Sequence, residues 1–282
     1  MIEETVERVG MIGAGAMGLA LLERLKIAAV QATVFDSDSP ALEAARALGC
    51  EIVSSAADVA RRSTLIDVVV RTDEDVVQCM TGLDGCLEGA ASGTLVLLHS
   101  SILPQTVKQI EAAAQKKSVF VVDACMTGVP ATVRAGELCF VAGGAKDLVA
   151  RAEPHLLKMG KQVFHMGPLG TGAVAKLIKN MVSGSETLIV HEAIKIGLAG
   201  GIPYPQALEM MRQIGHDSVL NRWQKTFDPS GKNPLPKSGR NVMNKDIPLA
   251  AELAHLYGLD VPITQELAKS AARVVQANKS AQ

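Results

Sequence analysis

Aromatic side chains are scarce in this 282-residue chain, in which phenylalanine, tyrosine and tryptophan together make up only 3% of the residues. So few rings argue against the base-stacking surfaces by which proteins bind single-stranded nucleic acid. An excess of one charge is lacking too, because 28 lysines and arginines are balanced by 29 aspartates and glutamates. No overall field therefore attracts nucleic acid or an anionic membrane. We expect small molecules and copies of the same chain as partners.

Cysteine occurs at five scattered positions, without the C-x-x-C spacing of metal or redox sites. An odd, dispersed set favours reduced thiols over disulfides and gives no metal cage. The acidic N-terminus has neither the basic nor the apolar segment of a signal peptide, and no apolar stretch is long and charge-free enough to span a bilayer. We expect a cytoplasmic protein with no membrane association and no bound metal.

A glycine-rich turn follows the first apolar run, residues 9–12, and precedes a helical pattern; it has the sequence Gly13-Ala14-Gly15-Ala16-Met17-Gly18. In a dinucleotide-binding βαβ unit the first glycine permits the tight turn and the second lets the backbone approach a pyrophosphate. The third lets the helix pack closely on the strand, and the first helical N–H groups point at the phosphates. This turn, with Ala16 and Met17, is our candidate cofactor site.

Asp36 ends the second apolar run at the distance expected for a ribose-binding acid. Its carboxylate can accept hydrogen bonds from both ribose hydroxyls but would repel a 2′-phosphate, so NAD is favoured over NADP. No arginine follows to neutralise a phosphate. An alternative is that Asp36 only forms a turn with the Ser, Asp and Pro residues that follow it.

Apolar runs alternate with helical patterns up to about residue 167, which predicts a Rossmann-type, doubly wound, mostly parallel sheet. Beyond that point the strand signals stop, and a long helix is expected at residues 173–199. We predict two domains, an NAD-binding Rossmann domain at 1–168 and an all-α C-terminal domain at 169–282. The expected strands are 30–35, 65–70, 94–98, 119–122, 138–141 and 162–165; the other expected helices are 40–48, 73–80, 104–114, 146–158, 205–214, 218–225, 245–257 and 262–275.

Lys176 and Asn180 lie one turn apart in the long predicted helix, so they share one face. A lysine among small and apolar residues is costly to desolvate unless it has a task. Partial burial lowers the pKa of such a lysine, which lets it exchange a proton with a substrate hydroxyl. Asn180 could bind the same hydroxyl or orient the lysine. The alternative is a lysine that extends to solvent beside an exposed asparagine.

Four segments, in this order, resemble the β-hydroxyacid dehydrogenases of the 3-hydroxyisobutyrate dehydrogenase-like family: residues 13–18, 123–128, 170–180 and 245–250. The resemblance spans nearly the whole chain. It implies NAD(P)-dependent oxidation of a 3-hydroxy acid to a semialdehyde or ketone, or the reverse reduction. It also implies that Lys176 is the catalytic general acid/base and that the chain forms a homodimer or homotetramer.

The resemblance assigns further residues. Thr127 stands where the family has a serine that, with neighbouring backbone N–H groups, holds the substrate carboxylate, and Gly128 follows as the family's first glycine; the alternative is a plain strand-end turn. Ser101 falls near the expected nicotinamide, whereas the adjacent His99 is more often structural than catalytic in such a position. Lys245 is expected near cofactor or substrate, with Asp246 fixing local geometry, unless both are ordinary first-turn helix charges.

Residues 227–240, rich in Pro, Gly, Lys and Ser, are expected to form a surface loop or a lid over the substrate, and they lack the family's aromatic residue ahead of Lys245. The substrate therefore cannot be inferred from the family. Two other functions stay open. An imine reductase would share this architecture, although Lys176 and Asp36 argue against it, and a cofactor-binding protein without catalysis would be expected to lack the lysine.

Overall fold

The computed structural model describes residues 7–226 and 242–280. The chain divides into two compact units, Met1–Lys176 and Leu177–Gln282, and the division falls inside one helix, α9 (Thr171–Ala199). The sequence-based boundary between residues 168 and 169 precedes this helix and stays a prediction.

The first unit is built on an eight-stranded sheet in the order β3-β2-β1-β4-β5-β6-β7-β8. All neighbouring strands pair in parallel except β6 and β7, which are antiparallel. The mostly parallel sheet expected from the sequence is therefore confirmed. The strands are β1 (Val9–Ile12), β2 (Ala32–Phe35), β3 (Glu51–Ile52), β4 (Leu65–Val68), β5 (Leu95–Leu98), β6 (Phe120–Thr127), β7 (Cys139–Gly143) and β8 (Gln162–Gly167).

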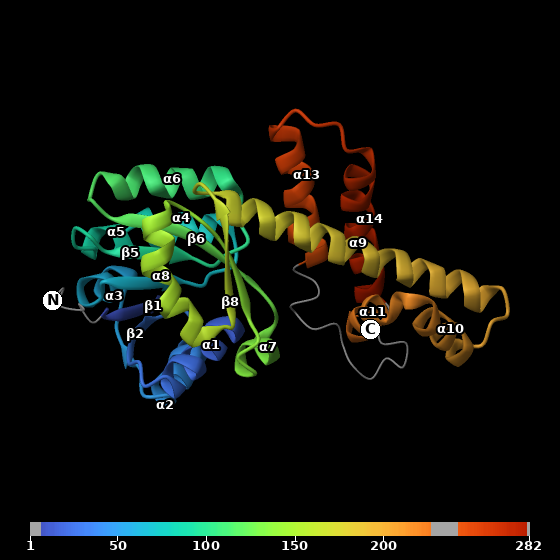
Figure 1. The fold of residues 1–282 in the computed structure, drawn as a ribbon, viewed down its shortest axis with the longest axis horizontal. Coiled ribbons are helices and arrows are strands. Elements are labelled where there is room, and N and C mark those ends of the chain that lie inside the picture. The colour runs from blue at the N-terminus through green and yellow to red at the C-terminus, as the bar shows by residue number, and fades with distance from the viewer. Residues whose placement is uncertain (1–6, 227–241, 281–282) are drawn as a thin grey trace. The chain divides into compact units, whose positions relative to one another are not determined.

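Helices cover both faces of this sheet (Figure 1). On one face lie α1 (Ala16–Ile27), α2 (Ser39–Ala47), α7 (Pro130–Arg134) and α8 (Lys146–Met159); on the other lie α3 (Ala56–Arg62), α4 (Asp73–Thr81), α5 (Cys86–Gly89) and α6 (Pro104–Gln115). Successive strand residues alternate between the two cores, as Met11 and Ile12 do. Burial on both sides explains why the central strands are almost continuously apolar.

Each predicted strand differs from the observed one by one to five residues at one or both ends. The strand expected at residues 119–122 continues to Thr127 as β6, and the strand expected from residue 30 begins only at Ala32. Ala29 adopts a left-handed backbone conformation with φ of 57°, and the Val30 N–H donates to the Leu25 carbonyl, so these residues close α1 instead. The short elements β3, α3, α5 and α7 were not predicted, because each spans too few residues to show a clear period.

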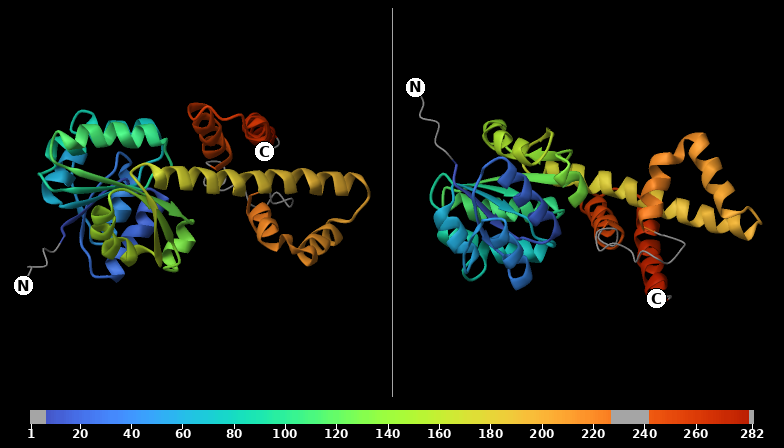
Figure 2. Two further views of the ribbon diagram at one scale, coloured as in Figure 1. Left: turned by 45° about the horizontal axis from the view of Figure 1, so that its top comes forward. Right: turned by 90° about the horizontal axis from the view of Figure 1, so that it is seen from below.

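The second unit is helical in its described part, as the sequence predicts. It contains most of α9 together with α10 (Tyr204–Met211), α11 (Asp217–Thr226), α13 (Ile247–Leu256) and α14 (Pro262–Ser280), and π-helical turns η1 (Arg212–His216) and η2 (Val242–Asp246). One apolar core joins these helices around Leu188, Leu220 and Ile247. Figure 2 shows α10 and α11, in orange, folded against the distal part of α9.

Gly184, the weak point of the predicted long helix, has a packing role. A Cβ there would lie 2.9 Å from Ile247 and 3.0 Å from Val242, so the missing side chain lets η2 and α13 approach α9 closely. The predicted lid at residues 227–240 lies outside the described residues. No helix within the described ranges is long and apolar enough to cross a membrane.

Candidate functional site

The glycine-rich turn joins β1 to α1 and has the geometry that its sequence requires. Gly13 has a φ of +99°, and a Cβ there would lie 2.4 Å from the Val69 carbonyl oxygen. A Cβ on Gly18 would lie 2.2 Å from the Gly13 carbonyl oxygen. At Gly15, in contrast, a Cβ would meet nothing within 4 Å, so the space beside its backbone is open. Two glycines thus make the turn possible and the third leaves room for a ligand.

The N-terminus of α1 is suited to an anion. Its cap, Gly15, provides no side-chain hydrogen bond, and no acidic residue stands in the first turn. The backbone N–H groups at the start of a helix have no partner within the helix and carry its positive dipole end. Gly15 and Ala16 are exposed and Met17 is half-buried. A pyrophosphate of a dinucleotide fits this arrangement.

Asp36 follows β2 and makes two backbone contacts. Its Oδ2 accepts the N–H of Ala14 at 2.6 Å, and its Oδ1 accepts the N–H of Asp38 at 2.8 Å. The second contact is the turn that the alternative interpretation of Asp36 expected. The first is a contact that the sequence did not indicate. Each carboxylate oxygen keeps further acceptor capacity, so both contacts are compatible with a ribose hydroxyl at this partly exposed residue.

His99 and Ser101 follow β5 at the same edge of the sheet. The Nδ1–H of buried His99 donates to the Ala124 carbonyl at 2.6 Å, and its Nε2 lies 2.8 Å from Asp67 Oδ1. Asp67 Oδ2 lies 2.8 Å from His155 Nε2 on α8. Burial alone would raise the pKa of Asp67, but the two imidazoles outweigh it and hold the pKa below its ordinary value. This network ties β4, β5, β6 and α8 together, which is the structural role expected of His99.

Lys176 and Asn180 both lie on α9 and both are buried, with 9% and 3% of their surfaces exposed. Asn180 is fixed by Asp246, because its Nδ2 donates to Asp246 Oδ2 at 2.6 Å. The Nζ of Lys245 lies 3.6 Å from the other oxygen of Asp246. The structure thus brings Asn180, Lys245 and Asp246 together and excludes an exposed asparagine or simple first-turn charges. Asp246 holds the side-chain amide of Asn180, and its role in the site stays a prediction.

Lys179, which the sequence reasoning did not single out, also belongs to this cluster. Its Nζ donates to Asn180 Oδ1 at 3.2 Å, so both ends of the Asn180 amide are held. Burial and the positive charge of Arg222 lower the pKa of Lys179 below its ordinary value, against the opposing charge of Asp246. Arg222 in turn pairs with Glu186.

Asp123 is the clearest residue that the sequence reasoning missed as an individual. From β6 its buried Oδ1 accepts the N–H of Gly170 at 2.8 Å, and its Oδ2 accepts the N–H of Ala173 at 2.7 Å. The carboxylate therefore caps the start of α9, the helix that carries Lys176. The signal available in the sequence was an acid inside an otherwise apolar strand, residues 119–126, together with the paired glycines Gly170 and Gly172.

The register of the sheet explains why this contact is possible. Ile12, Val68, Leu98 and Asp123 are aligned across β1, β4, β5 and β6, so Asp123 stands level with the carboxyl ends of the inner strands. β6 continues beyond that level, and antiparallel β7 returns to it, where Gly143 pairs with Asp123. β8 ends beside Gly143, and α9 begins there. The edge that holds the glycine-rich turn is thus also the edge at which α9 starts.

Thr127 ends β6, and its hydroxyl donates to the Cys139 carbonyl of β7 at 2.8 Å. The single hydroxyl proton is therefore engaged within the sheet, while the oxygen can still accept a hydrogen bond. A Cβ on Gly128 would lie 2.8 Å from Leu138 Cδ1, so a side chain there would require Leu138 to shift. The chain bends at Gly128, directly after β6, and an anion-binding role for Thr127 and Gly128 stays a prediction.

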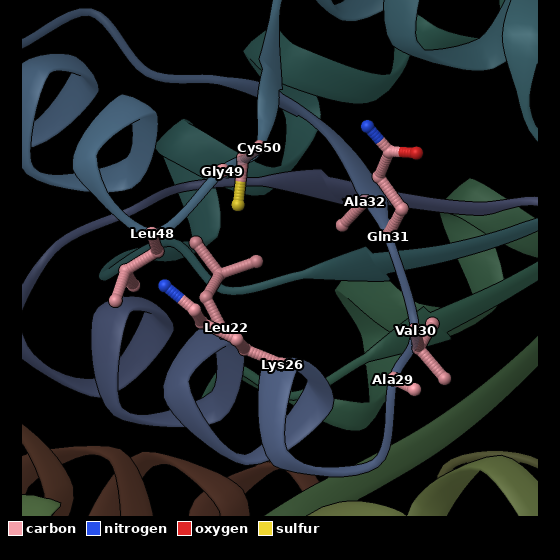
Figure 3. Close-up of a pocket in the computed structure, with 9 residues that line it drawn as sticks. All are labelled: Leu22, Lys26, Ala29, Val30, Gln31, Ala32, Leu48, Gly49 and Cys50. Carbon is pink, nitrogen blue, oxygen red and sulfur yellow. The ribbon is translucent and has the colours of Figure 1, made fainter.

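A cavity of about 190 Å³ lies elsewhere, between the end of α1, the start of β2 and the end of α2 (Figure 3). Leu22, Lys26, Gln31 and Cys50 are among its lining residues. It opens at the amino end of β2, whereas ligands of open α/β sheets bind beyond the carboxyl ends of the strands. Burial raises the pKa of the Cys50 thiol, so this cysteine is a poor nucleophile. Within residues 7–226 and 242–280, no cluster of three or more His, Cys, Asp or Glu side chains could hold a metal ion.

Comparison with known proteins agrees with this arrangement. Residues 8–167 match the NAD-binding domain of 6-phosphogluconate dehydrogenase. The NAD-dependent L-serine dehydrogenase of Pseudomonas aeruginosa is 29% identical over 92% of this chain and 89% of its own length.

Solved structures share the fold. The 3-hydroxyisobutyrate dehydrogenase of Mycobacterium tuberculosis, determined with L-serine, has a TM-score of 0.81 at 23% identity and covers 96% of this chain and 94% of its own. An imine reductase from Myxococcus stipitatus in complex with NADP+ has a TM-score of 0.68 at 19% identity, with the same coverages of 96% and 94%. The chain belongs to the 3-hydroxyisobutyrate dehydrogenase-like family of β-hydroxyacid dehydrogenases, NAD(P)-binding oxidoreductases that act on CH–OH groups.

Proposed function

We propose that this protein is an NAD-dependent dehydrogenase that interconverts a 3-hydroxy acid and its semialdehyde or ketone, with Lys176 as the general acid/base. The observation that carries the proposal is the buried pair Lys176 and Asn180 on a helix whose N-terminus is anchored at the carboxyl edge of the sheet. Lysine and asparagine at such positions can bind and deprotonate a hydroxyl that no solvent base reaches.

The proposed chemistry is a proton transfer coupled to a hydride transfer. NAD+, when bound, would supply the hydride acceptor for the carbon that bears the hydroxyl. The neutral amine of Lys176 accepts the hydroxyl proton as the carbonyl forms, and in the reverse direction its ammonium form returns that proton. Asn180, held at both ends by Lys179 and Asp246, is positioned to bind the same oxygen and to keep it oriented.

The residues at the glycine-rich turn support NAD as cofactor. Gly13, Gly15, Gly18 and the uncapped start of α1 would hold the pyrophosphate, with Ala16 and Met17 providing N–H groups. Asp36 would accept the ribose hydroxyls and disfavour a 2′-phosphate. Ser101 and Lys245 are proposed as further cofactor contacts.

The substrate carboxylate is proposed to bind at Thr127 and Gly128. A carboxylate needs donors, and the Thr127 hydroxyl now donates to Cys139. Binding in this way therefore requires the Thr127 side chain to turn its hydroxyl proton away from the sheet. The relatives named for L-serine and 3-hydroxyisobutyrate make these two compounds the first to test.

Formation of NADH tests the proposal. The purified protein is incubated with NAD+, with NADP+ as control, and with L-serine, 3-hydroxyisobutyrate, glycerate or threonate. The Lys176→Ala variant should retain NADH binding and lose turnover by about a hundredfold or more. Lys195→Ala, which removes an exposed lysine of the same helix, should retain both NADH binding and turnover. Turnover by Lys176→Ala at the rate of the natural protein would end the assignment of the lysine.

An imine reductase is the second candidate, favoured by the shared fold of the Myxococcus stipitatus enzyme. Reduction of a cyclic imine by NADPH, without turnover of any hydroxy acid, would support it. Binding of NADH with neither activity would support a non-catalytic cofactor-binding protein.

We also propose that the chain forms homo-oligomers. Ile178, Val182, Ile189 and Ile196 recur along one face of α9 and are all exposed, Ile196 at 73%. A row of exposed apolar side chains along one helix face is a common site of association between protein chains. A cytoplasmic location is part of the same proposal, because all five cysteines are free thiols.

A further inference from the structure

The Asp123 carboxylate spans the first turn of α9. Its two oxygens accept different N–H groups, one from Gly170 before the helix and one from Ala173 within it. Both belong to the donors at a helix start that have no partner within the helix. Lys176 lies one turn beyond Ala173 on the same helix. The position of the first turn, and with it the origin of the Lys176 side chain, is therefore set by a strand residue.

Two glycines clear the space that this contact needs. A Cβ on Gly172 would lie 2.6 Å from the Asp123 carbonyl oxygen and 2.8 Å from its Oδ2. A Cβ on Gly143, the β7 residue paired with Asp123, would lie 2.6 Å from its Oδ1. Neither glycine has a positive φ in the range that requires glycine. The two glycines thus allow the backbones of β6 and β7, together with the Asp123 carboxylate, to approach the start of α9 closely.

We propose that Asp123 is a positioning residue for the reaction, which holds the start of α9 so that the Lys176 amine meets the substrate oxygen. This inference rests on the proposed role of Lys176. A carboxylate accepts both N–H groups, whereas a protonated or amidated side chain keeps one good acceptor and turns an –OH or –NH2 towards the second N–H. Loss of the charge therefore frees one end of the turn.

The surroundings of Asp123 make its ionisation observable. Burial raises its pKa to about 6, although the N–H groups of Gly170 and Ala173 lower it. The groups that face it from β7 and α9 are the backbones of Gly143, Gly170, Gly172 and Ala173. His99, which follows β5, is directed to Asp67 and Ala124, and His165 on β8 is bonded to Gly144 and Gly167. The first charged side chain along α9 is Lys176.

The reductive direction separates Asp123 from Lys176. Here Lys176 must be protonated, so acidification below pH 7 leaves its proton in place. With methylmalonate semialdehyde and NADH as probes, kcat of the natural protein should fall on acidification through about pH 6. Asp123→Asn should have a kcat about ten- to hundredfold lower and flat over this range, with KM little changed. Asp123→Glu keeps the charge and should keep the acidic fall.

Two controls make the outcome decisive. Asp67→Asn removes another buried carboxylate of the sheet, whose two oxygens are hydrogen-bonded to His99 and His155. It should lower the melting temperature and leave the fall of kcat near pH 6 in place. If Asp123→Asn shows the natural kcat and the natural acidic fall, Asp123 is not a positioning residue.

A second measurement needs no substrate. Amide hydrogen exchange of residues 170–177 through local openings, in which Asp123 stays buried, should accelerate below about pH 6 relative to the intrinsic exchange rate, because the protonated side chain has lost one of its two acceptors. In Asp123→Asn this local exchange should be fast at every pH. Equal protection in both proteins would overturn the inference even if the enzyme proves inactive. If Asp123→Asn loses protection and Lys176→Ala keeps full activity, the proposed role of Lys176 is wrong, while the contact of Asp123 with α9 stands.

Discussion

The carboxylate of Asp36 accepts the backbone N–H of Ala14 at 2.6 Å, so the acid that follows β2 holds the glycine-rich turn that follows β1. One residue thus shapes the loop that would hold the pyrophosphate and presents the oxygens that would hold the ribose. Cofactor selection and loop conformation are coupled through it.

Asp36→Ala should weaken NAD+ binding and narrow the preference over NADP+. We expect the KM for NAD+ to rise about tenfold, since a hydrogen bond to a charged group contributes about 1.5 kcal/mol. The KM for NADP+ should change less, because the repulsion of a 2′-phosphate is removed as well. Asp38→Ala, an exposed residue of the same turn, is the matched control and should leave both constants as they are. If the ratio of the KM for NADP+ to the KM for NAD+ is the same in Asp36→Ala as in the natural protein, Asp36 does not select the cofactor.

Asp246→Ala should lower kcat by about tenfold or more, because Asn180 loses the acceptor that fixes its side-chain amide. Binding of NADH should persist. The comparison variant is Glu252→Ala, which removes an exposed acid from α13. Steady-state kinetics of the two variants with L-serine or 3-hydroxyisobutyrate measure the effect. Equal kcat values for Asp246→Ala and Glu252→Ala would show that the hydrogen bond from Asn180 to Asp246 does not contribute to catalysis.

The raised pKa of Asp123 also predicts how stability depends on pH. Its folded pKa of about 6 exceeds the ordinary value of 3.8, so the folded state holds a proton that the unfolded state has released between these values. The contribution of Asp123 to the free energy of unfolding is therefore greatest below about pH 4 and falls by about 3 kcal/mol as the pH rises to about 6. Urea unfolding at pH 4.5 and at pH 7 measures the free energy of unfolding of the natural protein and of Asp123→Asn. The difference between the two proteins should be larger at pH 4.5 than at pH 7. A difference that does not change with pH would contradict the raised pKa.

Ile189→Lys should separate the proposed oligomer into monomers, because it places a charge in the middle of the exposed apolar stripe of α9. Lys195→Ala, at an exposed position off the stripe, should leave the assembly intact. Sedimentation velocity at micromolar concentration distinguishes the two outcomes. A natural protein that sediments as a monomer would refute the oligomer itself.

The sequence predicted the sheet well because its central strands are buried on both faces and therefore consist of plain apolar runs. It also located the glycine-rich turn, since Gly13 and Gly18 meet steric requirements of the fold and Gly15 leaves the space beside the backbone open. The elements that escaped prediction, such as β3 and α7, are too short to show a period. Their positions are fixed by neighbours in space instead of by local pattern.

Within the candidate site, Lys176 and Asn180 could be found from helical spacing, because i and i+4 positions share a face. The contacts that position Lys176 and Asn180 could not be found in this way, because Asp123 and Asp246 lie far from these two residues along the chain. The same applies to the bond from Thr127 to Cys139, which depends on the antiparallel pairing of β6 with β7. Local sequence indicates what a helix presents, and only the tertiary structure shows what holds it in place.

The return of β7 along the extended end of β6 has a consequence for which parts of the chain can change length. Asp123 and Gly143 are a fixed pair of the ladder, and residues 124–127 and 139–142 pair between them, so an insertion in either strand would turn the Asp123 side chain to the opposite face or move it off the helix. The segment between the strands, α7 and its flanking residues, lies outside this ladder. Within that segment Val133 is buried in the core, so a change in chain length is expected to be tolerated best at the largely exposed residues 134–137, which precede β7.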